Sequence, residues 1–394
     1  MQHQPQPQLP KPDAESAAHS ARVAAMIREK IAAAGGQISF AEYMQHALYA
    51  PGLGYYRAGA TKFGAAGDFI TAPEISPLFG RVLARQCAQV LVTQDGSGIL
   101  EFGAGSGRLA VDLLRALAAL DALPGSYRIL EVSPDLQERQ ASLLRRELPE
   151  YYGRVSWLDR MPDQHVGVIV ANEVLDALPV ERFVRRDKGI AQLCVGIDHG
   201  EFVLQQRPAP DVLSDAVTAL EKYLQQPLPN GYTSEICLAA RHWAAELANV
   251  LQQGVAFLFD YGLGRREYYG PSRSGGWLRC HFRHHAHDNP LVLPGIQDIT
   301  AWVDFSAVAD AAHEHGLEIA GFVAQAQFLM AGGLDQELAE MDKMPLHAQL
   351  ELSRQAKLLT LPGEMGENFK CLGLVRGAVL TPDAFLAADR TATL

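Results

Sequence analysis

The chain has 394 residues, 48% of them hydrophobic and 20% charged, so it is long enough to bury a sizeable core and to form more than one domain. Its formal net charge of -11 argues against general nucleic-acid binding, which needs Lys and Arg side chains to neutralise phosphates. The five cysteines are scattered without a CxxC spacing, which argues against a disulfide framework and fits a reducing compartment.

The N-terminal part is expected to hold a tail and a helical segment. Residues 1–16 are polar and rich in Pro and Gln, which is typical of a disordered tail. Residues 17–95 are expected to form a helical lid segment, with one helix from about Ala17 to Ala34 and another that begins at Ser76-Pro77. Between these helices, GDFITAPEIS places Asp68, Thr71 and Glu74 on a loop, where they are candidate ligand contacts or simply a capping segment. No apolar stretch is long enough to span a membrane.

From Ile99 the pattern alternates between strand and helix, which predicts a mostly parallel sheet with helices on both faces. We therefore expect an α/β, Rossmann-like core over residues 96–380, followed by a C-terminal tail over 381–394. An insertion over about 185–235 separates the fourth and fifth strands and contains a hairpin that turns at Asp198-His199-Gly200. Seven strands are expected, at 98–102, 127–132, 154–158, 166–171, 255–260, and in the stretches LEIAGFVAQAQ and NFKCLGLVRG.

One connection tests this topology. If the strand order is 3-2-1-4-5, the chain must cross about 14 Å between the third and fourth strands. Residues 160–165 reach roughly 20 Å when extended. Little or no helix is therefore expected there.

The first strand ends in EFGAGSGRLA, where Glu101 precedes Gly103, Gly105 and Gly107. The third glycine comes one residue too early for the dinucleotide fingerprint, and the Lys-Ser/Thr end of a phosphate loop is absent. A G-x-G-x-G turn after an acid resembles the first motif of Rossmann-like S-adenosylmethionine (SAM) methyltransferases. The resemblance implies that the ribose and amino-acid tail of SAM pass over bare backbone, which only Gly allows. The alternative is a tight strand-to-helix turn without a ligand.

The next two strand ends supply further candidates for an adenosine site. Glu131 lies at the end of the second strand, where an acid is the usual acceptor for ribose hydroxyls. After the third strand, Asp159 is a candidate acceptor for the adenine amino group, and Met161 is a candidate contact to the ring. For Asp159, a helix cap is an equally good interpretation.

The fourth strand ends in VIVANEVLDALP, beside the switch point where open parallel sheets bind ligands. Asn172, Glu173 and Asp176 are therefore the candidate catalytic residues. Two carboxylates suit a planar guanidinium acceptor, and one of them can take the proton as the methyl group is transferred. The alternative for Asp176 is a turn residue or helix cap. Asp260, at the end of the fifth strand, lies at the same edge.

The stretch LRCHFRHHAHDNP invites a zinc interpretation, with Cys280 and four His residues between 281 and 287. Its spacing matches no standard zinc finger and no second Cys pair follows, so we expect no metal and instead a polar loop over the active site.

Several blocks together resemble one family. They occur in the order GDFITAPEISPLFG, EFGAGSGRLA, LEVSP, ANEVLDALPVERF, FDYG, PGIQDITAWVDFS and MGENFKCLGL. Over about residues 38–375, the chain resembles the MidA-like SAM-dependent methyltransferases, a family that includes the mitochondrial arginine methyltransferase of complex I assembly. The resemblance implies a Rossmann-like class I methyltransferase fold, SAM as donor, protein arginine as acceptor, and an enclosing role for Asp68 and Thr71. It also places SAM at the three glycines and Glu131, and the substrate near Asn172, Glu173 and Asp176.

We therefore expect a SAM-dependent methyltransferase whose leading activity is protein arginine N-methylation. A respiratory NADH dehydrogenase (complex I) subunit is a candidate substrate through the mitochondrial member, which methylates one symmetrically. Methylation of a small molecule or another residue, and a non-catalytic assembly chaperone, are the alternatives. Because Asp13 and Glu15 interrupt any Arg-rich amphipathic presequence, we expect a cytoplasmic member of bacterial type. The expected partner is a protein substrate, with no nucleic acid and no membrane insertion.

Overall fold

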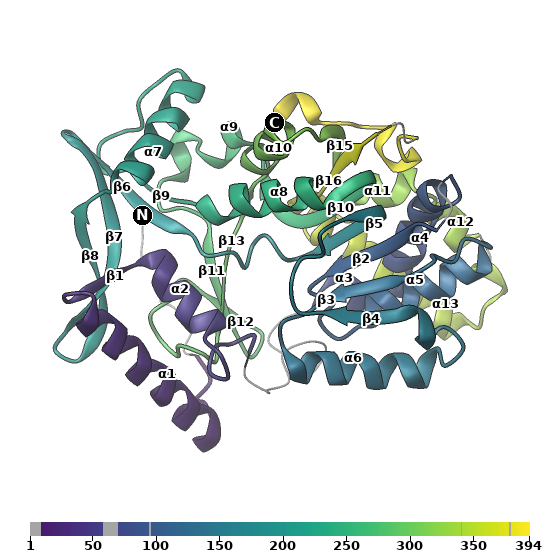
Figure 1. The fold of residues 1–394 in the computed structure, drawn as a ribbon, viewed down its shortest axis with the longest axis horizontal. Helices are drawn as coiled ribbons and strands as arrows, with labels where there is room; N and C mark the ends of the chain where they lie inside the picture. The colour runs from purple at the N-terminus through teal and green to yellow at the C-terminus, as the bar shows by residue number, and fades with distance from the viewer. Residues whose placement is uncertain (1–8, 58–69, 94–95, 340, 378–379) are drawn as a thin grey trace. The chain divides into compact units, whose positions relative to one another are not determined.

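A computed structural model describes residues 9–57, 70–93, 96–339, 341–377 and 380–394 (Figure 1). The chain divides into two compact units. Unit 1 comprises Met1–Phe69, Asp176–Ala240 and Arg266–Trp302, and unit 2 comprises Ile70–Leu175, Arg241–Arg265 and Val303–Leu394. This division differs from the predicted one. The N-terminal segment is split between the units, the insertion between the fourth and fifth strands is longer, and residues 266–302, which follow the fifth strand, also belong to unit 1.

Unit 2 is built on one large sheet. Its main path runs β15-β16-β10-β5-β2-β3-β4, and the short β14 also pairs with β10. The pairs from β4 to β10 are parallel, whereas β16 is antiparallel to both of its neighbours. These strands are β2 (Gly98–Phe102), β3 (Tyr127–Leu130), β4 (Val155–Leu158), β5 (His165–Asn172), β10 (Leu251–Leu263), β14 (Val303–Asp304), β15 (Glu318–Ala324) and β16 (Phe369–Arg376).

The predicted order 3-2-1-4-5 is confirmed as β4-β3-β2-β5-β10. Residues 159–164 join β4 to β5 without a helix, as the short crossing requires. The sheet has eight strands instead of the predicted seven. The additional strand is β14, whose two residues pair with Gly262 and Leu263 of β10. Two residues are too few to show an alternating pattern in the sequence.

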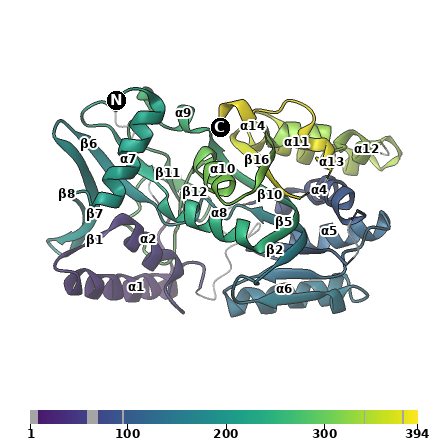
Figure 2. The same cartoon turned by 45° about the horizontal axis from the view of Figure 1, so that its top comes forward.

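Helices cover both faces of this sheet, as predicted (Figures 1 and 2). Ile99, Val168 and Phe257 point to one face and share a core with α4 and α5. Phe102 points to the other face, where the ring of Trp243 from α8 meets it edge-on at a centroid distance of 5.3 Å. The helices of unit 2 are α3 (Ala72–Ile75), α4 (Pro77–Leu91), α5 (Arg108–Ala119), α6 (Pro134–Glu147), α10 (Phe305–Glu314), α11 (Gln325–Ala331), α12 (Leu334–Leu338), α13 (Leu346–Thr360) and α14 (Met365–Asn368); α8 (Leu238–Val250) begins in unit 1 and continues into unit 2.

The helix predicted at Ser76-Pro77 is α4. Ser76 Oγ accepts the N–H of Leu78 at 3.2 Å, and Pro77 occupies the first helical position. The helix carries an apolar stripe from Leu78 to Leu91, and this stripe is buried. Because this stripe packs against α5, the helix belongs to unit 2 and not to a separate N-terminal segment.

The last residues of the chain, predicted as a tail, are part of the unit 2 core. The ring of Phe385 is buried and stacks on Phe257 at a centroid distance of 5.9 Å. It also covers two glycines, because a Cβ atom on Gly321 or Gly373 would lie 2.7 or 2.5 Å from the Phe385 side chain. The prediction missed this segment because its apolar residues follow neither a helical nor a strand period.

Unit 1 contains a five-stranded sheet with the path β1-β7-β6-β9 and with β8 paired to β7. A three-stranded sheet, β12-β11-β13, follows later in the chain. The strands are β1 (Gln37–Ser39), β6 (Glu181–Arg186), β7 (Gly189–Asp198), β8 (Glu201–Pro208), β9 (Thr233–Ile236), β11 (Leu278–Phe282), β12 (His285–His287) and β13 (Asp298–Ala301). The α-helices are α1 (Ala14–Ala33), α2 (Phe40–Tyr49) and α7 (Asp211–Leu224), together with α9 (Arg265–Tyr268), whose first residue is assigned to unit 2.

The two turns predicted in unit 1 have different outcomes. The hairpin at Asp198-His199-Gly200 is confirmed: Asp198 pairs with Glu201, and His199 and Gly200 have φ of 47° and 85°. The His-rich stretch is not a loop but the hairpin of β11 and β12, which turns at Arg283 and His284. Within the described ranges, no group of three or more His, Cys, Asp or Glu residues could hold a metal ion.

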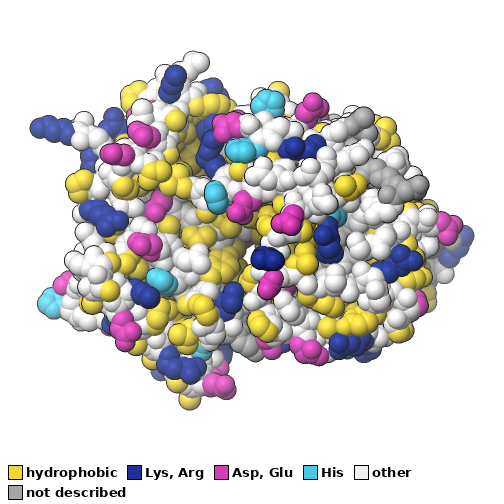
Figure 3. Space-filling view, in the orientation of Figure 1, with side chains coloured by type: hydrophobic (Ala, Val, Ile, Leu, Met, Phe, Trp, Pro, Cys, Tyr) yellow, Lys and Arg dark blue, Asp and Glu magenta, His cyan; other side chains and the backbone are white. Residues whose placement is uncertain are grey.

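The N-terminal helix begins earlier than predicted. Asp13 caps α1 by accepting the N–H of Ser16 at 2.8 Å, so residues 14–16 of the predicted tail are helical. Residues 1–8 of that tail lie outside the described residues. None of the described helices has both the length and the apolar character needed to cross a bilayer. On the face drawn in Figure 3, basic and acidic side chains are interspersed.

Candidate functional site

The glycine loop between β2 and α5 has the backbone conformation that its composition predicts. Gly103, Gly105 and Gly107 all have positive φ, of 60°, 54° and 86°. A Cβ atom on Gly103 would lie 3.4 Å from Val174, and one on Gly107 would lie 3.3 Å from the Cα of Gln140. Glycine is therefore required by the conformation at all three positions, and the space beside Gly107 is also restricted.

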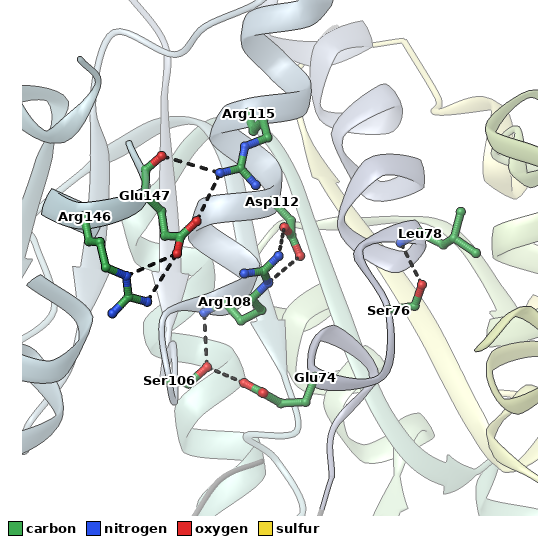
Figure 4. A network of polar contacts seen from close by, with 9 residues as sticks. All are labelled: Glu74, Ser76, Leu78, Ser106, Arg108, Asp112, Arg115, Arg146 and Glu147. Atoms are coloured by element: carbon green, nitrogen blue, oxygen red, sulfur yellow. Dashed lines mark hydrogen bonds and ion pairs between the residues drawn. The ribbon is translucent and has the colours of Figure 1, made fainter. Parts of the chain in front are cut away.

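The loop is joined to the start of the α3–α4 segment (Figure 4). The Ser106 hydroxyl donates a hydrogen bond to the Glu74 carboxylate and accepts the N–H of Arg108 at 3.2 Å. Thr71 is the N-cap residue of α3, and its side chain makes no capping hydrogen bond. Asp68 lies outside the described residues. Part of the predicted lid segment therefore contacts the glycine loop through Glu74, which the sequence placed in the same segment as Thr71.

Glu131 directly follows β3 and is buried, with 6% of its surface exposed. Its Oε1 accepts the N–H of Ser133 at 2.8 Å, and its Oε2 accepts a hydrogen bond from Gln140 Nε2 at 3.3 Å. A buried carboxylate only accepts hydrogen bonds, which matches the two donating hydroxyls of a ribose. The position and the chemistry both fit the predicted ribose acceptor.

Gln140 and Trp157 belong to the same network and were missed by the sequence reasoning. Gln140 Nε2 also donates to the Gly105 carbonyl at 3.0 Å, and Gln140 Oε1 accepts the indole N–H of Trp157 at 2.8 Å. A signal was present: Leu136, Gln140 and Leu144 are spaced one turn apart on the buried face of α6, where a polar residue needs partners.

Glu101 is a buried residue of β2. Its Oε2 accepts the hydroxyl of Tyr127 at 2.7 Å, and 2% of the residue is exposed. Burial and, to a smaller extent, the charge of Glu131 raise the pKa of Glu101 to about 7, although the hydrogen bond from Tyr127 opposes them. The side chain thus contacts Tyr127 directly, and a contact to the cofactor remains a prediction.

Asp159 and Met161 follow β4 in the connection to β5. Asp159 is exposed and Met161 is half-buried. Both lie after the carboxyl end of a strand that pairs with β3, as predicted for residues beside an adenine. Their contacts to a ligand remain predictions.

Asn172 and Glu173 lie at the carboxyl end of β5, between β2 and β10. Asn172 Nδ2 donates to Glu173 Oε1 at 3.2 Å, and Asn172 Oδ1 is buried without a hydrogen-bond partner among the described residues. Glu173 has a φ of 53°, which costs about 1–2 kcal/mol for a residue with a side chain. An orphaned buried acceptor beside a strained residue is typical of a functional site.

Asp260 of β10 holds the segment that follows Glu173. Its Oδ2 accepts the N–H of Leu175 at 2.9 Å, its Oδ1 accepts the N–H of Tyr261 at 2.9 Å, and the side chain is fully buried. The Glu173 N–H also donates to the carbonyl of Phe259 at 2.9 Å. The backbone after β5 is therefore fixed to β10.

Asp176 belongs to unit 1, because the division falls between Leu175 and Asp176. It is buried, and its backbone carbonyl accepts the N–H of Ala301 at 2.9 Å. The next carbonyl, of Ala177, accepts the hydroxyl of Tyr49 at 2.9 Å. The structure therefore groups Asn172 and Glu173 within unit 2, and a joint role with Asp176 remains a prediction.

Comparisons with known proteins agree with this geometry. Residues 82–323 match the family described as "Putative S-adenosyl-L-methionine-dependent methyltransferase". "Protein arginine methyltransferase NDUFAF7, mitochondrial" of Danio rerio is 31% identical over 88% of this chain and 85% of its own length, and the human protein is 30% identical over 86% and 80%. The Drosophila melanogaster homologue is 31% identical over 95% of this chain and 90% of its own.

Two crystal structures from Burkholderia thailandensis are similar over nearly the whole chain. One, bound to S-adenosyl-homocysteine, has a TM-score of 0.93 and 41% identity, and covers 98% of this chain and 100% of its own. The other, a native structure, has a TM-score of 0.91 and 40% identity over the same shares.

Proposed function

The chain belongs to the S-adenosyl-L-methionine-dependent methyltransferase family, and on this premise we propose that it methylates the guanidinium of arginine in a protein substrate. The arginine acceptor is supported by the names of relatives that are 30–31% identical over at least 80% of their own lengths. The observation that carries the proposal is the end of β5, where the strained Glu173 lies beside the orphaned oxygen of Asn172.

The residues of unit 2 fit the methyl donor. The glycine loop leaves the backbone bare at Gly103, Gly105 and Gly107, and the Glu131 carboxylate would accept hydrogen bonds from the ribose hydroxyls. Asp159 and Met161 would contact the adenine, and Thr71 and Asp68 would help to enclose the donor. When bound, S-adenosyl-L-methionine supplies an electrophilic methyl group.

The acceptor chemistry is assigned to Asn172, Glu173 and Asp176. A guanidinium is planar and almost always protonated, so its nitrogens are poor nucleophiles in water. The Glu173 carboxylate would localise the positive charge and take the proton that the nitrogen loses on methylation. Asn172 Oδ1 would accept a hydrogen bond from the same group, and Asp176 would supply a second carboxylate.

The partner and the location are part of the same proposal. Through its resemblance to the mitochondrial member, we include a subunit of a respiratory NADH dehydrogenase among the candidate substrates. A cytoplasmic location is supported by the five cysteines, none of which forms a disulfide in the part of the chain that the structure describes.

The experiment is methyl transfer from radiolabelled SAM into protein extract from cells that lack this gene. Amino-acid analysis of the labelled protein should yield methylarginine. Labelled methyl-lysine, a methylated carboxylate or a labelled small molecule would contradict the arginine assignment. Binding of a protein partner without any transfer would instead support the chaperone alternative.

A further inference from the structure

Gln140 is a buried polar residue whose side-chain contacts join three parts of the SAM site. Its exposed fraction is 0%, and it lies on the apolar face of α6 between Leu136 and Leu144. Burying an amide is unfavourable unless its polar atoms are hydrogen-bonded. Here the amide contacts the glycine loop, the end of β3 and β4, through Gly105, Glu131 and Trp157.

Trp157 determines which way the amide faces. The indole N–H only donates, so the atom 2.8 Å from Trp157 Nε1 has to be the Gln140 oxygen. The amide nitrogen then faces the other way and has two hydrogens for two acceptors. These acceptors are the Gly105 carbonyl at 3.0 Å and Glu131 Oε2 at 3.3 Å.

Gly107 allows α6 to come close enough for these contacts. The Cα, Cβ and Cγ atoms of Gln140 all lie 3.3–3.4 Å from the position that a Cβ atom on Gly107 would occupy. The third glycine of the loop is thus needed for the approach of Gln140 as well as for its own positive φ.

We propose that Gln140 is a positioning residue that fixes the Glu131 carboxylate relative to the glycine loop, so that the ribose hydroxyls meet their acceptor at the correct distance. One amide group bonds both the carboxylate and the loop, so neither moves without breaking a buried hydrogen bond. This inference rests on the proposed role of Glu131 as ribose acceptor. It gives Trp157 a role too, because its indole N–H prevents the amide from turning over.

The test measures the affinity of the protein for S-adenosyl-homocysteine and for the analogue that lacks the ribose 2′-hydroxyl. The wild type should bind the analogue on the order of tenfold more weakly, since a hydrogen bond to a carboxylate is lost. Gln140→Met keeps the approximate size of the side chain and removes its hydrogen bonds. It should weaken binding of S-adenosyl-homocysteine and reduce the preference for the hydroxyl to about threefold or less.

The preference for the hydroxyl separates positioning from simple packing. Gln325 is a matched control, because it is equally buried in unit 2 and donates to the Leu359 carbonyl at 3.0 Å. Gln325→Met should lower stability but keep the full preference. If Gln140→Met also keeps the full preference, while both affinities fall equally, the proposal is overturned.

Two more variants complete the test. Trp157→Phe removes the indole N–H that orients the Gln140 amide, so it should also reduce the preference for the hydroxyl. This variant tests the proposal independently if Gln140→Met does not fold. Glu131→Ala should abolish the preference. If Glu131→Ala retains it, the ribose is held elsewhere, which overturns the role of Glu131 and this proposal together. If only the Gln140 and Trp157 variants retain it, Glu131 keeps its role and the positioning role of Gln140 is wrong.

Discussion

The carboxylate of Asp260 on β10 accepts the backbone N–H of Leu175 at 2.9 Å, two residues after Glu173. Its second oxygen accepts the N–H of Tyr261, so the two oxygens are used by two different backbone segments. An acid on the neighbouring strand thereby fixes the backbone that follows the candidate catalytic residue.

The first prediction concerns this contact. Asp260→Asn leaves one oxygen to accept and turns an NH2 group toward the second backbone N–H, which is unfavourable in a buried site. We expect methyl transfer to fall at least tenfold, while the affinity for S-adenosyl-homocysteine changes less than threefold. Calorimetric binding and initial rates on the same preparation measure both quantities. A large loss of binding with normal turnover would contradict the assigned role.

The second prediction uses two glycines with positive φ. Gly105 has a φ of 54° in the glycine loop, and Gly200 has a φ of 85° in a hairpin of unit 1 with no atom within 4 Å of its missing Cβ. Alanine at either position should lower the free energy of unfolding by about 1–2 kcal/mol. Only Gly105→Ala should also weaken S-adenosyl-homocysteine binding, by at least tenfold. Equal binding by the two variants would exclude close approach of the ligand at Gly105.

The third prediction separates the chemistry at Glu173 from its backbone strain. Glu173→Gln should reduce methyl transfer at least 10²-fold and leave SAM affinity nearly unchanged, because it removes the charge but keeps the shape. Glu173→Gly should be equally inactive. Position 173 has a φ of 53°, which suits glycine. The free energy of unfolding of Glu173→Gly should therefore be unchanged or about 1 kcal/mol higher than that of the wild type.

Asp121 is the control for this pair, because it is exposed and has a φ of 52°. Asp121→Gly should match the stability change of Glu173→Gly and keep full activity. Retained activity in Glu173→Gln would show that the carboxylate is not needed to take the proton.

The fourth prediction is a pH dependence of stability. Burial raises the pKa of Glu101 from 4.5 to about 7, so between these values the folded protein binds more protons than the unfolded chain. Its contribution to the free energy of unfolding therefore decreases as pH rises through this window, by roughly 3 kcal/mol in total. Glu101→Gln removes this dependence. Denaturant unfolding should show that the free energy of unfolding of the wild type falls relative to that of Glu101→Gln as the pH is raised from 4 to 8. Parallel curves would mean that Glu101 titrates normally in the folded state.

The sheet could be predicted because buried parallel strands are continuous apolar runs, and because six residues between β4 and β5 leave no room for a helix. The glycine loop could be predicted because positive φ and glycine go together. The network of Gln140 could not, since which side chain meets Trp157 depends on how α6 packs. The strain at Glu173 was also hidden, because a glutamate after a strand carries no sign of a left-handed backbone.

The division into units was equally hard to predict. The apolar stripe of α4 shows that the helix is buried but not which partner buries it, and here that partner is α5. Residues 266–302 have no compositional boundary, yet they belong to unit 1.

The position of Phe385 has a consequence for proteolysis. Its ring fills the space over Gly321 and Gly373, two glycines on adjacent strands of unit 2. A protease that cuts before this residue would leave the strands of unit 2 in place but open a void above two residues that have no side chains to fill it. Loss of a buried phenylalanine ring costs about 3–5 kcal/mol, so the clipped protein should unfold at a lower temperature than the intact one.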